Sequence, residues 1–455
     1  MHIKWIRCRV RSVVIFLLFI LSLFVYLKFK TFIDVALANF AHRNYLIEHA
    51  QFQCHHSNVD SNVSKIFLLI DDFFVSYNAY HDIDGENFIR ILGLRYILTA
   101  PPIFCAIFQI QDDKLVYVSL IKGHYVFINQ NPACLNPKLC TATGFDAYYV
   151  KCPLPKQPLN SLAVSVALIN SSYIETVTSC QTISTLPKLK VHMRKDIRHA
   201  NATNFLSVCI SPVHNFDNIN LLQFFFNHYI HHGVEKFIVY KRSWSDGVNN
   251  LLKSLKLRNY VEIVDWPLFP HAKSFDLNDN RLVHYFGQNL AINDCIWRMK
   301  YHSDFVLSID LDEFIVFNDE NLTISRMLRN LLTDNVPFSG VMFKNRFANF
   351  DLTNISASNP VHLDKKIWHI YGQRSKVLVK PEKVDLFAIH RVWRFKKKQR
   401  ADGDSIEEPL IMGEREQSAM IHWRSKTSSD FEHLEKNATE MRKIFPYLFR
   451  SQKLW

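Results

Sequence analysis

The sequence predicts an α/β protein in which a mainly parallel sheet flanked by helices follows a smaller β-rich domain and an N-terminal transmembrane helix. Three observations support this prediction: an apolar run with basic flanks near the N-terminus, short apolar runs between turn residues in the first half, and alternating strand and helix patterns from residue 204. With 455 residues, 48% of them hydrophobic, and only 11 glycines, the chain can bury a sizeable core and is neither disordered nor fibrous.

The N-terminus predicts an uncleaved signal anchor. Residues 1–11 form a basic cytosolic tail, and residues 12–27 form the membrane helix, in which the run from Val13 to Leu27 is apolar except for Ser22. At about 1.5 Å per residue the apolar run spans about 23 Å, which suits a thin early-secretory membrane. A cleaved signal peptide is the alternative, but the possible cleavage site Ala36-Leu37-Ala38 lies well beyond the apolar run. We therefore expect a single-pass type II protein with a lumenal body.

Two further features agree with a lumenal body. Eight of the nine cysteines follow the anchor, an even number that fits disulfides in an oxidising compartment, although the sequence does not predict their pairing. The chain also carries six Asn-x-Ser/Thr sequons, which are candidate glycosylation sites. These are Asn62, Asn170, Asn201, Asn321, Asn354 and Asn437.

The body divides into a stem and two domains. Residues 28–60 are mixed and predict a stem, and residues 61–200 carry apolar runs separated by turn residues, which predicts a β-rich domain. Residues 201–455 then alternate strands and helices, which favours a mainly parallel sheet with right-handed crossovers. The expected elements are strands at 205–210, 236–240, 261–264 and 305–309 and helices at 219–232, 248–257 and 286–301.

Two carboxylates, Asp310 and Asp312, follow the last of these strands. Strand ends at a crevice bind ligands in α/β sheets, and two hard oxygen ligands suit Mn²⁺ or Mg²⁺ carrying a diphosphate. The pattern therefore indicates a nucleotide-sugar transferase, although a plain turn or helix cap would give the same local pattern. Two other Asp-x-Asp triplets, Asp82-Ile83-Asp84 and Asp402-Gly403-Asp404, follow no apolar strand and predict solvated loops.

The net charge of +12 leaves several classes of partner open. An anionic sugar nucleotide or a membrane surface suits a basic protein. A nucleic acid is not expected, because the anchor and the sequons conflict with it. The densest basic cluster, residues 394–400, predicts a solvated loop.

The order of motifs in the second half resembles glycosyltransferase family 92, a family of animal and plant galactosyltransferases with a GT-A-like fold. The resemblance covers roughly residues 205–435. Its motifs are Leu206-Ser207-Val208-Cys209-Ile210-Ser211-Pro212, His228-Tyr229, Gly233-Val234-Glu235-Lys236-Phe237, Gln288-Asn289-Leu290-Ala291-Ile292-Asn293-Asp294-Cys295 with Arg298, Asp310-Leu311-Asp312-Glu313-Phe314, Lys376-Val377-Leu378-Val379-Lys380-Pro381, Ile389-His390 and His422-Trp423-Arg424-Ser425-Lys426.

The resemblance implies a Golgi enzyme that uses UDP-galactose and Mn²⁺ and transfers galactose, with inversion to a β linkage, to a glycan acceptor on a glycoprotein or glycolipid. It also implies that Asp310 and Asp312 serve the metal and the nucleotide sugar. Two positions depart from the family pattern, since Asn227 replaces an acidic residue before the His-Tyr pair and Lys241 replaces Asp or Asn after Tyr240. A catalytically inactive, transferase-like glycan-binding protein is therefore the alternative.

Within this site we expect Asp312 to ligate the metal directly and Asp310 to contact the ribose or a metal-bound water. A histidine would complete a site suited to Mn²⁺, with His422 as the first candidate and His390 as the second. Lys426 lies four residues after His422 and is a candidate for a phosphate contact.

Other candidates are less specific. Asn293 and Arg298, on the helix before the Asp-x-Asp strand, either contact the donor or pack that helix on the sheet. Glu313 is expected to hydrogen-bond the turn beside the metal. The general base that inversion needs is expected downstream, with Asp351 and Glu414 as the first candidates ahead of Glu382 and Glu416.

Overall fold

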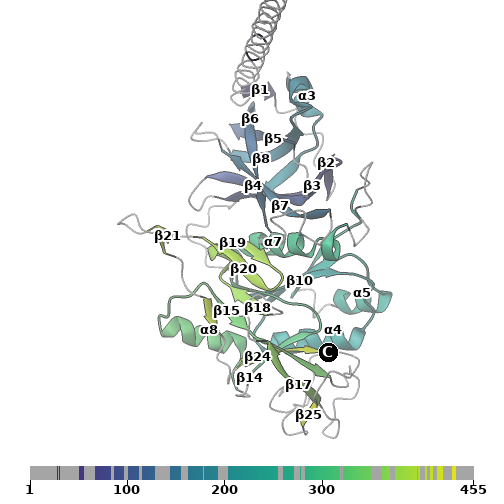
Figure 1. Ribbon diagram of the computed structural model, residues 1–455, viewed down its shortest axis with the longest axis vertical. Helices are drawn as coiled ribbons and strands as arrows, with labels where there is room; N and C mark the ends of the chain where they lie inside the picture. The colour runs from purple at the N-terminus through teal and green to yellow at the C-terminus, as the bar shows by residue number, and fades with distance from the viewer. Residues whose placement is uncertain are drawn as a thin grey trace, which may run out of the picture.

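The computed structural model places an N-terminal β-domain against one side of a mixed α/β domain, with helix α7 between them (Figure 1). The structure describes residues 28, 30, 51–55, 67–82, 87–96, 101–111, 115–128, 144–154, 162–177, 179–192, 203–254, 260–270, 277, 282–317, 319, 321–349, 361–368, 375–396, 398–399, 405–406, 410–412, 418–423 and 433–436.

The N-terminal domain is a closed β-barrel, which confirms the predicted β-rich region. Seven strands form the ring β6-β5-β8-β9-β3-β4-β7, which closes because β6 pairs with both β5 and β7. Strand β1 pairs with β6, and β2 pairs with β3. The elements are β1 Gln51–His55, β2 Leu68–Asp71, β3 Phe74–Asp82, β4 Phe88–Tyr96, β5 Ile103–Gln111, β6 Leu115–Phe127, β7 Phe145–Pro153, β8 Leu162–Asn170, η2 Ile174–Thr176, α3 Cys180–Ser184 and β9 Leu189–His192.

Apolar side chains form a buried cluster within the barrel. Successive side chains on a strand point to opposite faces, so alternate residues such as Ile89 and Ile91 enter the same cluster. A disulfide between Cys105 and Cys152 joins β5 to β7 in this cluster. Small domains with limited cores gain stability from such a cross-link.

The α/β domain is built on a seven-stranded sheet of order β12-β11-β10-β13-β18-β15-β23. Strands β12, β11, β10 and β13 are mutually parallel, as predicted, whereas β18 is antiparallel to both of its neighbours. Its elements are β10 Asn204–Val213, α4 Ile219–His231, β11 Lys236–Lys241, α5 Asp246–Lys253, β12 Val261–Asp265, η3 His284–Gly287, α7 Gln288–Met299, β13 Ser303–Ser308, α8 Ile324–Thr333, β15 Gly340–Phe343, β18 Lys376–Val379 and β23 Leu410–Met412.

The helix signals in the sequence correspond to helices in the structure. Helix α4 ends at His231, and Gly233 follows with φ of 86°, the left-handed conformation that glycine adopts at helix ends. The predicted helix 286–301 begins with the short 3₁₀ segment η3 and becomes α-helical only at Gln288.

A second sheet extends from the end of the Asp-x-Asp turn. It has five strands in the order β14-β24-β16-β17-β25, and two short hairpins complete the domain. The strands of this sheet are β14 Glu313–Phe317, β16 Asn345–Asn349, β17 Val361–Trp368, β24 Ser418–Trp423 and β25 His433–Lys436. One hairpin pairs β19 Val384–Ala388 with β20 Arg391–Phe395, and the other pairs β21 Lys398–Gln399 with β22 Ser405–Ile406. The short 3₁₀ helix η4 Pro381–Lys383 precedes β19.

The core has a layer on each face of the seven-stranded sheet. One layer contains apolar residues of α4, α5 and α8, and the other joins α7 to residues of the barrel. A disulfide between Cys209 of β10 and Cys295 of α7 links helix to sheet, so the expectation of disulfides in the body is confirmed. The barrel and the α/β domain therefore share one apolar layer.

Charged residues are also buried between the two domains, which corrects two sequence predictions. Asp82 is only 2% exposed and pairs with Arg90, Lys300 and Lys396, so it does not lie in a solvated loop. Although burial opposes ionisation, these cations lower the pKa of Asp82 to about 2. The start of the basic cluster at 394–400 is likewise structured, because Arg394 lies in β20 and pairs with Asp385.

No helix in the described part of the chain is long and apolar enough to cross a membrane. The predicted anchor at 12–27 lies outside the described residues.

Candidate functional site

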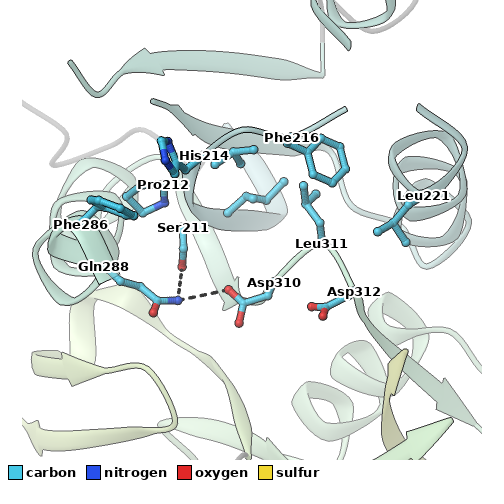
Figure 2. Close-up of a pocket in the computed structure, with 12 residues that line it drawn as sticks. Ser211, Pro212, His214, Phe216, Leu221, Phe286, Gln288, Asp310, Leu311 and Asp312 are labelled. Carbon is cyan, nitrogen blue, oxygen red and sulfur yellow. Dashed lines mark hydrogen bonds between the residues drawn. The ribbon is translucent and has the colours of Figure 1, made fainter. Parts of the chain in front are cut away.

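A cavity of about 390 Å³ lies at the carboxyl ends of β10 and β13 (Figure 2). From β10 the chain crosses to β11 and β12 on one side, and then returns through α7 to β13 on the other side. Neighbouring strands whose connections leave in opposite directions form a crevice at the edge of an α/β sheet, where ligands bind. The lining residues are Ile210, Ser211, Pro212, Val213, His214, Phe216, Leu221, Phe286, Gln288, Asp310, Leu311 and Asp312.

The carboxylate of Asp310 is held on both oxygens. The amide of Gln288, at the start of α7, donates to Asp310 Oδ1 at 3.3 Å and to the hydroxyl of Ser211 at 2.9 Å (Figure 2). The ammonium of Lys376, at the start of β18, lies 2.8 Å from Asp310 Oδ2. Two separate elements, α7 and β18, therefore determine where this carboxylate points.

Lys376 also pairs with Glu313, which places a buried ion triad beneath the Asp-x-Asp turn. The ammonium lies 3.0 Å from Glu313 Oε2, and both side chains are almost completely buried. Burial alone would lower the pKa of Lys376, but the carboxylates of Asp310 and Glu313 raise it above its usual range. Glu313 accepts the backbone N–H of Asp310 at 2.9 Å, so the prediction that it hydrogen-bonds the turn is confirmed.

The His-Tyr pair of α4 supports the strand that follows the turn. The hydroxyl of Tyr229 donates to the carbonyl of Glu313 at 2.9 Å, and His228 Nε2 lies 2.8 Å from the carbonyl of Ile315. Burial lowers the pKa of His228 to about 3, so the ring is neutral at physiological pH. These two residues hold β14 in place and are not in contact with the cavity.

Two non-glycine residues in or beside the cavity lining adopt the left-handed backbone conformation: Phe286 lines the cavity, and Asn215 lies in sequence between the lining residues His214 and Phe216. Asn215 has φ of 49° and Phe286 has φ of 52°. Non-glycine residues in this region cost energy and concentrate at functional sites. The ring of Phe286 lies between His214, with centroids 4.8 Å apart, and the guanidinium of Arg242, 4.4 Å from its centroid.

The structure brings some of the predicted metal ligands together. Asp310 and Asp312 both line the cavity, and the backbone of His422 in β24 pairs with Glu313, directly after Asp312. His390 lies near the site through Ser375, the residue before Lys376. Its Nδ1 is 3.2 Å from the carbonyl oxygen of Ser375. Within the described ranges, no group of three or more His, Cys, Asp or Glu side chains forms a metal site.

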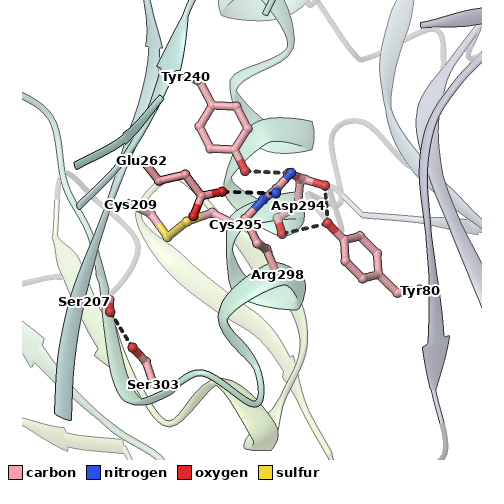
Figure 3. Close-up of a disulfide and its surroundings, with 9 residues drawn as sticks. All are labelled: Tyr80, Ser207, Cys209, Tyr240, Glu262, Asp294, Cys295, Arg298 and Ser303. Carbon is pink, nitrogen blue, oxygen red and sulfur yellow. Dashed lines mark hydrogen bonds and ion pairs between the residues drawn. A yellow bond between two sulfur atoms is a disulfide. The ribbon is translucent and has the colours of Figure 1, made fainter. Parts of the chain in front are cut away.

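The structure favours the packing alternative for Asn293 and Arg298. The amide of Asn293 bonds the carbonyls of Asn289 and Phe387, and the guanidinium of Arg298 pairs with Asp294 and Glu262 (Figure 3). Neither residue lines the cavity. A contact between either residue and a donor stays a prediction.

The neighbour of Asn293, Asp294, is the centre of a polar cluster between the two domains. Its carboxylate is fully buried and accepts hydrogen bonds from Tyr80 at 2.5 Å and Tyr240 at 2.6 Å (Figure 3). It also accepts one from Asn78 at 2.7 Å. Tyr80 and Asn78 belong to the barrel, and Tyr240 to β11. The barrel thereby holds the helix whose first residue, Gln288, contacts Asp310.

Several predicted residues lie outside the described part of the chain. Among the sequons, Asn321 is exposed, whereas the amide of Asn170 donates to Asp71 at 2.6 Å. The undescribed candidates are Lys426, Asp351, Glu414 and Glu416, together with the sequons at Asn62, Asn201, Asn354 and Asn437.

Sequence reasoning did not identify Gln288, Ser211 or Lys376 as site residues. All three occur within the motifs that resemble the family, but nothing local marks them as neighbours of Asp310. The available signal was their position at the end of a strand or the start of an element.

The family comparison agrees with the resemblance found in the motifs. The model of glycosyltransferase family 92 matches residues 204–447, more than half of the chain. No curated protein matches the sequence. Among solved structures, HddC from Yersinia pseudotuberculosis is 10% identical with a TM-score of 0.26, and the match covers 48% of this chain and 93% of that one. Ferredoxin-NADP+ reductase from Plasmodium falciparum is 11% identical with a TM-score of 0.12, and the match covers 51% and 84%.

Proposed function

We propose that this chain, which belongs to glycosyltransferase family 92, is a Golgi enzyme that moves galactose from UDP-galactose onto a glycan acceptor with inversion to a β linkage. Family membership implies a glycosyltransferase with a sugar donor and an acceptor. The observation that carries the proposal is the pair Asp310 and Asp312 beside a cavity at the crevice of a mainly parallel sheet.

The donor set of this site fits a divalent cation. Asp312 would hold Mn²⁺ or Mg²⁺, with Asp310 beside it, because these ions prefer hard oxygen ligands and complete their shells with phosphate oxygens. When bound, the ion neutralises charge that develops on the departing diphosphate. His422 is the favoured histidine ligand, since its backbone stands opposite Glu313, and His390 is the alternative.

The chain's own residues shape the donor site. Pro212, Phe216 and Phe286 provide apolar surface suited to a planar base, and the hydroxyl of Ser211 provides a polar contact beside them. Lys426 is proposed for the diphosphate. Asp351 and Glu414 remain the candidates for the base that removes the proton of the acceptor hydroxyl.

The location in the Golgi membrane is supported by the sequence. Residues 12–27 form an apolar run whose basic flank favours a cytosolic N-terminus, and the disulfides Cys105–Cys152 and Cys209–Cys295 suit an oxidising lumen.

The proposal is tested with residues 28–455, which retain the barrel because it packs against α7. The purified protein is incubated with individual UDP-sugars, with and without Mn²⁺, and released UDP is measured. We expect Mn²⁺-dependent release from UDP-galactose, and near-complete loss in Asp312→Asn. The matched control Asp334→Asn changes an exposed aspartate at the end of α8 and should be silent. Release of UDP from none of the sugars would favour the inactive glycan-binding alternative.

A further inference from the structure

The ion triad beneath the cavity places a lysine where it competes with a metal. The ammonium of Lys376 lies 2.8 Å from Asp310 Oδ2, and the amide of Gln288 lies 3.3 Å from Oδ1. Both oxygens of this carboxylate therefore have protein partners. Asp312 lines the same cavity two residues later.

Lys376 is held in this position by its two partners, and moving its ammonium away would cost free energy. Its side chain is 1% exposed, and its second partner, Glu313, is 2% exposed. Moving the ammonium away would take a positive partner from the buried Glu313 carboxylate, which is strongly unfavourable. Glu313 is in turn held by the backbone N–H of Asp310.

We propose that Lys376 withholds Asp310 from a divalent cation, so that the cation binds weakly alone and tightly only together with a nucleoside diphosphate. The inference rests on the proposed function, because it concerns the same site. A cation that approaches Asp310 meets the positive charge of Lys376 beside the same carboxylate. Asp312 alone supplies too few oxygen ligands for a divalent cation. The diphosphate oxygens supply the ligands that Asp310 does not provide. Lys376 is thus a positioning residue that makes metal binding depend on the donor.

The wild-type protein provides the first test. Binding of Mn²⁺ to residues 28–455 is measured by electron paramagnetic resonance of the free aquo ion, with Mn²⁺ alone and with Mn²⁺ plus UDP. We expect UDP to tighten Mn²⁺ binding by about tenfold or more, a coupling of the usual size between linked sites. Equal affinity with and without UDP overturns the inference but not the proposed function. No Mn²⁺ binding even with UDP overturns both.

A double variant tests the role of Lys376 itself. Lys376→Met combined with Glu313→Gln removes one positive and one negative charge, so the net charge of the Lys376, Glu313, Asp310 and Asp312 group stays at −2 (three carboxylates and one ammonium before, two carboxylates after). The two charges of the buried pair disappear together, and the contact of Lys376 with Asp310 Oδ2 is removed. We expect Mn²⁺ alone to bind about tenfold more tightly than to wild type, with a smaller effect of UDP.

A purely structural role for Lys376 predicts the opposite outcome, because a loosened site binds Mn²⁺ equally or more weakly than wild type. That result overturns the inference.

The matched control is Lys380→Met. Its ammonium stands over the ring of Phe338, 4.1 Å from the centroid, just beyond the same strand. It should leave Mn²⁺ binding unchanged, and tightening equal to that of the double variant would show that loss of any nearby lysine has the same effect, which overturns the inference. If the double variant does not fold, the wild-type comparison still tests the inference, because equal affinity with and without UDP overturns it.

Discussion

The carboxylate of Asp294 should contribute more to stability than the exposed carboxylate of Glu262, the other partner of Arg298. Four donors from the barrel, β11 and α7 converge on it, and its side chain is 0% exposed. Hydrogen bonds to a charged group contribute about 1.5–3 kcal/mol each, with incomplete additivity. Breaking a buried ion pair costs about 3–5 kcal/mol. We therefore expect Asp294→Ala to lower the free energy of unfolding by about 4 kcal/mol.

The assay is urea denaturation of residues 28–455 followed by tryptophan fluorescence, because Trp266 and Trp297 are buried in the layer shared by barrel and sheet. Two variants calibrate the result. Tyr80→Phe removes one of the four donors and should cost about 1 kcal/mol. Glu262 is the other partner of Arg298, and its side chain is 39% exposed. Glu262→Gln should therefore cost less than about 1 kcal/mol.

The reasoning is refuted if Asp294→Ala costs no more than Glu262→Gln. That outcome would mean that the two domains are held together by their shared apolar layer, with the polar cluster neutral overall.

Four further predictions follow from the structure. Asp312→Asn should reduce turnover by a factor of about 100 or more with little change in the thermal midpoint, because the proposed metal ligand is lost while the partly exposed side chain packs little. The pKa of Asp82 is lowered from 3.8 to about 2 in the folded state, so its ionised form stabilises the fold above pH 4, and this stabilisation is lost as the pH falls towards 2. The ionised form should make wild type about 2 kcal/mol more stable than Asp82→Asn above pH 4, and this difference should shrink between pH 4 and 2 when unfolding is measured at a series of acid pH values. Gly233→Ala should lower the free energy of unfolding by about 1–2 kcal/mol in denaturant titrations, because φ is 86° and an added Cβ meets Ser325. Asn321→Gln should abolish a glycosidase-sensitive gel shift, whereas Asn170→Gln should not, because the Asn170 amide is bonded to Asp71; the reverse pattern would contradict the assignment.

The sequence alone determined the features that depend on neighbouring residues. Apolar periodicity placed the strands and helices from residue 204, and Gly233 marked a helix end because its backbone must adopt positive φ. Asp310 and Asp312 were recognisable because two carboxylates followed a buried strand.

The environment of each charged side chain depended on contacts distant in sequence. In the sequence Asp82 resembles a loop residue, yet it is the last residue of β3 and is buried with Lys300 and Lys396, which lie 218 and 314 residues away. Gln288 and Lys376 reach Asp310 from 22 and 66 residues away. The order of the strands brings these groups together, and no local pattern encodes that order. The sequence therefore determined which carboxylates face the cavity, and only the tertiary structure decided which charges hold them there, because desolvation and pairing arise from chain segments that meet only in the folded state.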